Sequence, residues 1–191
     1  MRAMEGYLPI AWRVCRALDD PVRLKMLRAV LTSRNPMAVG DICSCVGEKE
    51  SVTSQYLRIL NSQGFIVATR RGRHVLYERR TDADRALTRV IDELAALCAH
   101  GGPEWAEAVL ASLPAFSSAR KIAILGTLRK VGGLKLDELA GRTCMPLKTC
   151  YRIVDELSLR GLVEWSDGDG VVTPTPPTEG FAKAFYDLAT A

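Results

Sequence analysis

The chain has 191 residues, a length that suits one or two domains, and its hydrophobic content of 48% is ample for folded cores. The net charge of +4 is unevenly spread: residues 1–100 carry 16 Lys and Arg against 11 Asp and Glu, whereas residues 101–191 carry 10 against 11. This balance favours a phosphate-bearing partner for the first half. No apolar run is long enough to cross a bilayer and no signal-peptide core follows Met1, so we expect a cytoplasmic protein without a membrane partner.

Short helices are predicted along the first fifty residues. Asp20 and Pro21 are a typical N-cap and first-turn pair for the second helix. A third helix is expected over residues 41–46, and Gly47 then makes the turn into a helix that begins near Ser51. The apolar stripes of the first two helices are Leu8, Ala11, Val14, Cys15 and Leu18, and Leu24, Leu27, Val30 and Leu31.

The helix that begins near Ser51 combines an apolar stripe with a hydrogen-bonding face. Leu57, Leu60 and either Val52 or Thr53 recur at helical spacing and are expected to face inward. Hydroxyl, amide and guanidinium groups read base edges in the major groove of DNA. The candidate DNA contacts of this helix are Ser51, Thr53, Ser54, Gln55, Tyr56 and Arg58, with Tyr56 ambiguous between core and base contact.

A basic β-hairpin is predicted directly after this helix. Gly64 can end the helix in the left-handed conformation, and residues 65–67 and 75–77 are expected to pair as strands with Gly72 in the turn. Its tip would offer Arg70, Arg71, Arg73 and His74 to DNA phosphates. A solvated, positively charged edge that deters aggregation is the competing interpretation.

A long amphipathic helix follows the hairpin, and a hinge over residues 100–103 then leads to a second module. The helix is indicated by the stripe Leu87, Val90, Ile91, Leu94, Leu97 and Cys98, which suits a dimer seam. A shift of 97 residues aligns the second module with the first, placing Gly64 on Gly161 and Leu60 on Leu157. Its hairpin carries Glu164, Asp167 and Asp169, which would repel phosphate. We therefore predict a mainly α fold with small β wings, built from tandem winged helix-turn-helix domains over residues 1–100 and 101–191.

Three segments of the first half together resemble the DNA-binding domain of the ArsR/SmtB family of bacterial transcriptional repressors. They are ALDDPVRL, the pattern Ser-x-x-Ser-x-x-Leu-x-x-Leu and the pattern Arg-x-Gly-Arg-x-x-x-Tyr, within residues 11–98. The resemblance implies a homodimer built on the first and last helices of this domain, a two-fold symmetric DNA operator and release of DNA when an inducer binds. The second half resembles a generic winged helix of the MarR or IclR sort.

The cysteines suggest two alternatives for the unknown inducer. Cys43 and Cys45 could bind a thiophilic metal or metalloid, but Ala38 and Gly40 stand where the arsenic-sensing members have two of their cysteines, and two buried small side chains are the competing interpretation. Cys15 and Cys98 lie on the two helices that the family packs at its dimer seam, so a redox bridge there is the second alternative. Structural thiols compete with that interpretation, and we assign no cofactor.

The sequence thus predicts a sequence-specific, DNA-binding transcriptional regulator, interpreted as a homodimeric repressor that binds a double-stranded operator and is released by a small inducer or thiol modification. The alternative is a protein-interaction module that uses its winged helices as docking surfaces. An enzyme is not expected, because no acid/base or nucleophilic constellation is present.

Overall fold

The computed structural model describes residues 10–165 and 170–191. It divides the chain into two units, which we call the N-terminal unit (Arg13–Leu113) and the C-terminal unit (Pro114–Ala191 with residues 10–12). Leu8 of the predicted first stripe, and Asp167 and Asp169 of the predicted acidic hairpin, lie outside the described residues.

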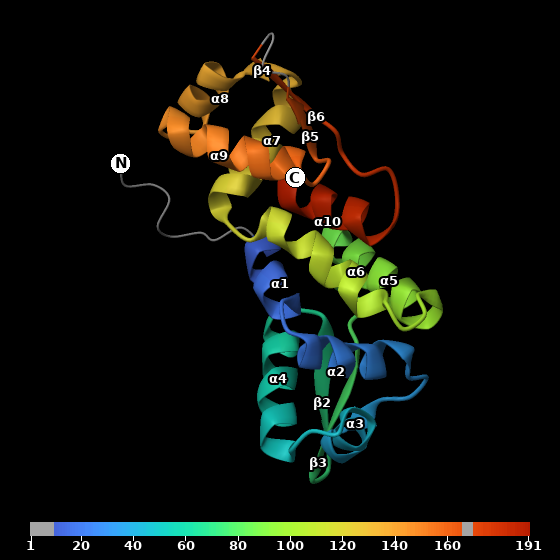
Figure 1. Cartoon of the computed structure of the whole chain (residues 1–191). Helices are drawn as coiled ribbons and strands as arrows, with labels where there is room; N and C mark the ends of the chain where they lie inside the picture. The colour runs from blue at the N-terminus through green and yellow to red at the C-terminus, as the bar shows by residue number, and fades with distance from the viewer. Residues whose placement is uncertain (1–9, 166–169) are drawn as a thin grey trace. The chain divides into compact units, whose positions relative to one another are not determined.

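Helices make up most of the N-terminal unit and are followed in Figure 1 from blue to yellow-green. They are α1 (Ile10–Leu18, which begins in the other unit), α2 (Pro21–Thr32), α3 (Val39–Val46), α4 (Glu50–Ser62), α5 (Arg85–His100) and α6 (Trp105–Ser112). The predicted cap of α2 is confirmed: the Asp20 carboxylate accepts hydrogen bonds from the backbone nitrogens of Val22 (2.9 Å) and Arg23 (3.0 Å). Local sequence therefore fixes where α2 begins.

Three antiparallel strands form a small sheet in the order β1 (Met37–Ala38), β3 (His74–Arg79) and β2 (Ile66–Arg71). The register pairs Met37 with Tyr77 and Ala68 with Tyr77 from either side of β3, and it pairs Arg71 with His74 at the hairpin turn. Ile66 and Tyr77 are buried, at 0% and 6% exposure, so the base of the hairpin is anchored in the core. Beyond that base both strands are exposed except at the half-buried Val67 and Leu76.

The core of this unit is formed by residues of helices α1 to α5 and by the start of the hairpin. Its fully buried members include Leu18, Leu24, Met26, Leu27, Ile42, Leu57, Leu60, Phe65, Ile66 and Ile91. Helix α3 begins at Val39, two residues before the predicted start, because Asp41 lies inside its first turn and its carboxylate accepts from the Ala38 nitrogen at 3.1 Å. Helix α3 ends at Gly47, whose φ of 73° turns the chain toward α4.

Helix α6 packs against α2 within the N-terminal unit. Trp105 is 4% exposed, and the Arg28 guanidinium lies 5.5 Å from the centre of its ring. The sequence pattern places residues 101–113 in the second module, after the glycine hinge. The structure instead divides its units at Leu113, so α6 extends the first unit beyond a minimal winged helix.

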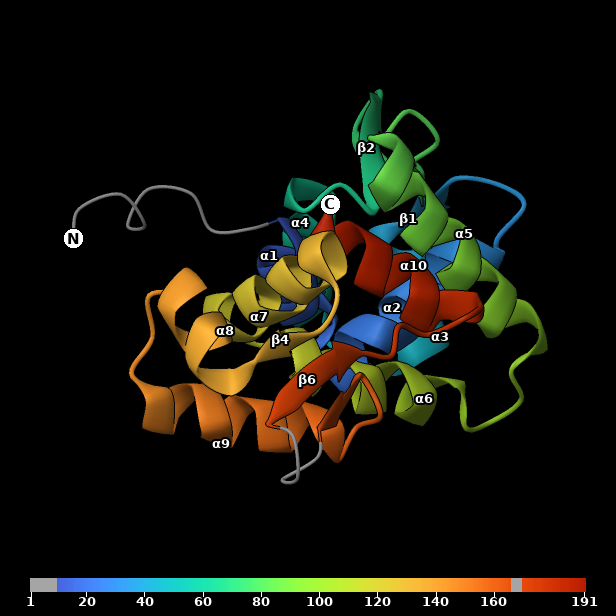
Figure 2. The same cartoon turned by 90° about the horizontal axis from the view of Figure 1, so that it is seen from above.

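The C-terminal unit repeats the order of elements of the N-terminal one. Its elements are α7 (Ala119–Val131), β4 (Leu134–Lys135), α8 (Leu136–Arg142), α9 (Leu147–Ser158), β5 (Val163–Trp165), β6 (Val171–Pro174) and α10 (Gly180–Thr190), with the short helix η1 (Leu113–Phe116) at the boundary. The strand order β4-β6-β5 matches β1-β3-β2. Helix α10 packs against α7, and both can be followed in Figure 2, in red and yellow.

The two units carry chemically different residues at two pairs of corresponding positions, 97 residues apart in the chain. Cys144 occupies the place of Gly47 and adopts a φ of 52°, a left-handed conformation that costs a non-glycine residue about 1–2 kcal/mol. Lys121 occupies the place of Leu24 and is 9% exposed; its ammonium group donates to the Pro114 carbonyl (2.8 Å) and pairs with Glu156. The buried charge is thus paired, as its burial requires.

Within the residues that the structure describes, no single helix is long and apolar enough to cross a membrane. One bent pair, Trp105–Phe116 with Ala119–Val131, meets the length and composition requirement only when its two helices are taken together.

Candidate nucleic-acid interface

Helix α4 presents a polar face formed by four of the predicted DNA contacts. Ser51, Gln55 and Arg58 are exposed and Ser54 is half-buried, while Leu57 and Leu60 on the opposite face are fully buried. The spacing of three to four residues places these polar groups on one side of the helix. They include hydroxyl and amide groups, which both donate and accept hydrogen bonds at base edges, and a guanidinium group, which only donates.

Thr53 was predicted as a DNA contact, and the structure corrects this. Its side chain is 0% exposed, and no hydrogen-bond partner for its hydroxyl is found among the described residues. Helical periodicity allowed either Val52 or Thr53 to face inward, and packing selects Thr53, because Val52 is only half-buried. Thr53 therefore belongs to the core beneath the reading face.

Tyr56 is half-buried and lies against the start of α2. The Arg23 guanidinium is 5.2 Å from the centre of its ring, and the Asp20 carboxylate, by its charge and by a side-chain hydrogen bond, raises the pKa of the phenol. Arg23 in turn donates to the carbonyls of Ala17 (2.8 Å) and Arg16 (2.9 Å). The ring is thus held by the cap of α2, which favours a packing role over a base contact.

The β2–β3 hairpin carries the predicted cationic tip. Gly72 has a φ of 63° and occupies the first position of the two-residue turn, where tight hairpins favour glycine. Arg70, Arg71, Arg73 and His74 are all exposed around it. Two side-chain hydrogen bonds lie within the tip: Arg70 donates to the Gly72 carbonyl and Arg73 to the His74 ring, each at 3.3 Å.

Two further arginines at the base of the hairpin have acidic partners. Arg79 pairs with Asp92 of α5, and Arg80 lies 3.8 Å from Asp82. Their charge is thereby partly neutralised, whereas the tip arginines face solvent. The cationic surface available to a ligand is therefore concentrated at the tip.

Helix α4 and the hairpin are neighbours in the fold, because α4 packs against β2. In the view of Figure 1 the N-terminal half of α4 and the hairpin tip both point to the lower end of the unit. One element thus offers hydrogen-bonding groups, and its neighbour offers three guanidinium groups. This combination can place one element in a groove and the other on the phosphate backbone.

The candidate thiol sites gain no support from the geometry. Cys43 is half-buried, Cys45 is exposed, and no group of three or more His, Cys, Asp and Glu that could hold a metal is found in residues 10–165 and 170–191. Cys15 and Cys98 are both buried, at 2% exposure. Cys15 donates to the Leu113 carbonyl (3.3 Å), and burial raises the pKa of Cys98 to about 11, against a smaller lowering by Arg28. A protonated, buried thiol is a poor nucleophile, so the burial of Cys98 argues against a redox bridge with Cys15.

The sequence interpretation missed a second group of polar residues, on α2. Lys25 and Arg28 lie three residues apart and face a pocket that also includes Trp105. The helical spacing of two cations was visible in the sequence. The contribution of Trp105, 77 residues farther along than Arg28, was not, because it depends on tertiary packing.

Helix α4, the turn before it and the two-stranded hairpin after it make the N-terminal unit a winged helix. Residues 20–67, which run from the cap of α2 to the start of β2, match the model of the arsR family of bacterial regulatory proteins. This segment is therefore an ArsR-family helix-turn-helix domain. The HTH-type transcriptional regulator NmtR of Mycobacterium tuberculosis (strain ATCC 25618 / H37Rv) is 34% identical over 62 residues, which are 32% of this chain and 50% of that protein. The matched region thus spans half the length of this relative.

Proposed function

We propose that this protein is a sequence-specific, DNA-binding transcriptional regulator that reads a double-stranded operator with its N-terminal unit. The observation that carries the proposal is the polar face of α4 beside the cationic tip of the hairpin, within an ArsR-family domain. Helix α4 enters the major groove, and Arg70, Arg71 and Arg73 contact phosphates. A cytoplasmic location follows from this partner, and the proposal assigns no catalytic step.

The test compares base reading with backbone binding. The operator is first selected from random duplex DNA with the reduced protein. Gln55→Ala should then weaken binding to that operator by about 1–3 kcal/mol and barely change binding to random DNA, since a base contact discriminates between sequences. Thr81→Ala, at an exposed position outside both DNA-binding elements, is the control. Equal losses on the two DNAs would contradict a base contact.

We propose in addition that the protein acts as a homodimeric repressor released by an inducer. One α4 per chain reads one half-site, and two-fold symmetry supplies the second. The exposed face of α5, which includes Ala96 and Ala99, is a better candidate for the seam than the predicted stripe, because Val90 and Leu94 are 0% exposed within one chain.

For the C-terminal unit we propose a second winged helix that does not read DNA. Exposed apolar side chains lie on α9 and directly after it: Leu147, Tyr151 and Leu159, at 53%, 48% and 84% exposure. Tyr151 also packs edge-on against Trp165 of β5, 5.0 Å between ring centres. Such an apolar surface favours protein contact over phosphate contact, so the alternative function, a docking module, applies to this unit.

A further inference from the structure

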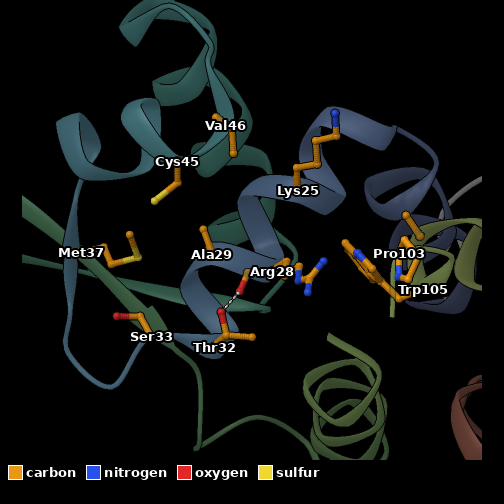
Figure 3. A pocket seen from close by; sticks show the side chains of 11 residues that line it. Lys25, Arg28, Ala29, Thr32, Ser33, Met37, Cys45, Val46, Pro103 and Trp105 are labelled. Atoms are coloured by element: carbon orange, nitrogen blue, oxygen red, sulfur yellow. Dashed lines mark hydrogen bonds between the residues drawn. The ribbon is translucent and has the colours of Figure 1, made fainter. Parts of the chain in front are cut away.

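A pocket of about 620 Å³ lies within the N-terminal unit, outside the nucleic-acid interface. Figure 3 shows its lining: Met37, Cys45 and Val46 lie on one side of α2, and Pro103 and Trp105 lie on the other. The volume falls in the range of about 300–1,000 Å³ that is usual for small-molecule sites. Helix α6, which extends this unit beyond a minimal winged helix, supplies one wall.

The charge of the pocket is positive. Lys25 and Arg28 line it from successive turns of α2, and the lining contains no Asp or Glu. No ion pair joins either cation to a carboxylate among the described residues. Two unneutralised cations on one helix face favour an anionic ligand.

The other walls are apolar. The indole of Trp105 stacks with the Arg28 guanidinium, and Met37, Val46 and Pro103 add aliphatic and thioether surface. The two hydroxyls at the rim are already engaged, since Thr32 donates to the Arg28 carbonyl and Ser33 to that of Asn35. An inorganic anion would leave the apolar walls unused, whereas a planar organic anion would use both. The lining therefore selects a carboxylate on an aromatic or similarly apolar body.

The pocket adjoins the element that positions the reading helix. Cys45 and Val46 are the last two residues of α3, and Gly47 then turns the chain into α4. A ligand held between α2, α3 and Trp105 would contact both helices that orient α4. We propose that this pocket binds a small aromatic carboxylate and is the effector site of the protein. The effector role rests on the proposed function, whereas ligand binding does not.

The first test locates binding with two probes of the same shape, 1-naphthylacetate and its neutral amide. Cys45 lines the pocket and Cys144 does not, yet both thiols are exposed. In the full-length wild-type protein, 1-naphthylacetate should slow alkylation of Cys45 by iodoacetamide at least threefold and leave Cys144 unchanged, as measured by peptide mass spectrometry. The neutral amide should protect Cys45 much less. No protection by the carboxylate at millimolar concentration, or equal protection by both probes, would overturn the proposal.

The second test removes the charges. Lys25→Gln should weaken binding of 1-naphthylacetate about tenfold by calorimetry and leave the weak amide binding unchanged, with Arg142→Gln in the C-terminal unit as the matched control. Lys25 is exposed, so this variant should keep the wild-type circular dichroism spectrum. If Lys25→Gln binds the carboxylate as wild type does, the cation is not part of the site and the proposal fails.

The third test concerns the effector role, which is decided separately from whether the pocket binds the carboxylate. On the selected operator, 1-naphthylacetate should change the Kd of the wild type by at least fivefold and that of Lys25→Gln by much less. Pocket binding without any change in operator affinity would overturn the effector role. If the protein does not bind DNA even without the probe, the proposed function fails, while the first two tests still decide whether the pocket is a carboxylate site.

Discussion

Thr53 is a core residue whose buried hydroxyl lowers the stability of the fold. Its oxygen is buried without a hydrogen-bond partner among the described residues. The corresponding residue of the C-terminal unit is Cys150, which is also 0% exposed but far less polar. Burying an unpaired hydroxyl costs about 1–3 kcal/mol, so valine, of nearly the same shape, suits this position better.

We predict that Thr53→Val raises the free energy of unfolding by roughly 1 kcal/mol, because it removes the unpaired hydroxyl without opening a cavity. Urea unfolding followed by circular dichroism measures the change. Operator affinity should stay within twofold of wild type. A large loss of affinity at unchanged stability would return Thr53 to the DNA-binding surface.

Residue-scale predictions succeeded where local chemistry decides the outcome. The N-cap at Asp20 and the positive φ of Gly64 (85°) and Gly72 (63°) follow from short-range rules. The choice between Val52 and Thr53 does not, because a rotation of α4 by a fraction of a turn exchanges the two. The orientation is set by what packs beneath the helix, which no local pattern contains.

At the scale of elements, the hairpin should govern nonspecific affinity. Replacing Arg71 and Arg73 together by alanine removes two phosphate contacts, each of which releases counterions worth about 0.9 in the log–log dependence of affinity on salt. We expect the slope to flatten by roughly one to two units in fluorescence anisotropy titrations.

The matched control for the hairpin is Arg80→Ala, since Arg80 lies beside Asp82 at the base of the hairpin. That variant should keep the wild-type slope. An unchanged slope in the double variant would mean that the hairpin tip does not contact DNA.

Element boundaries, too, are predicted from sequence where local residues decide them and not where tertiary packing decides them. The glycine hinge after α5 was visible in the sequence and suggested that a new module begins at residue 101. Helix α6 nevertheless packs on α2, through Trp105 and Arg28. The pocket between them could not be predicted from sequence for this reason, whereas the polar face of α4 and the basic hairpin could.

At the scale of the whole molecule, the proposed dimer is the next property to measure. Sedimentation velocity should give twice the chain mass, and the bound operator should show two half-sites separated by about 34–36 Å, one helical turn. Ala96→Glu with Ala99→Glu places like charges on the exposed face of α5 and should favour monomers that bind the operator weakly.

Ala96→Gln with Ala99→Gln, which places neutral side chains of similar size at the same exposed positions, is the control that adds no charge to the seam. Charges at the buried Val90 and Leu94 would instead disrupt the core, so they do not test the seam. An intact dimer in the double glutamate variant would move the seam away from α5.

The hairpin, anchored at its base and exposed beyond it, has a mechanical consequence. Tyr77 is fixed in the core, and the pair Arg71 and His74 lies three residues farther out, about 10 Å away. Arg79 also ties the base of β3 to Asp92 of α5. A small rotation at the base therefore produces a large displacement at the tip. A tilt of the hairpin by about 20° moves its arginines by roughly 3–4 Å over that length. That displacement exceeds the length of a hydrogen bond, so a small rearrangement among the helices would be enough to lift the guanidinium groups off the phosphates.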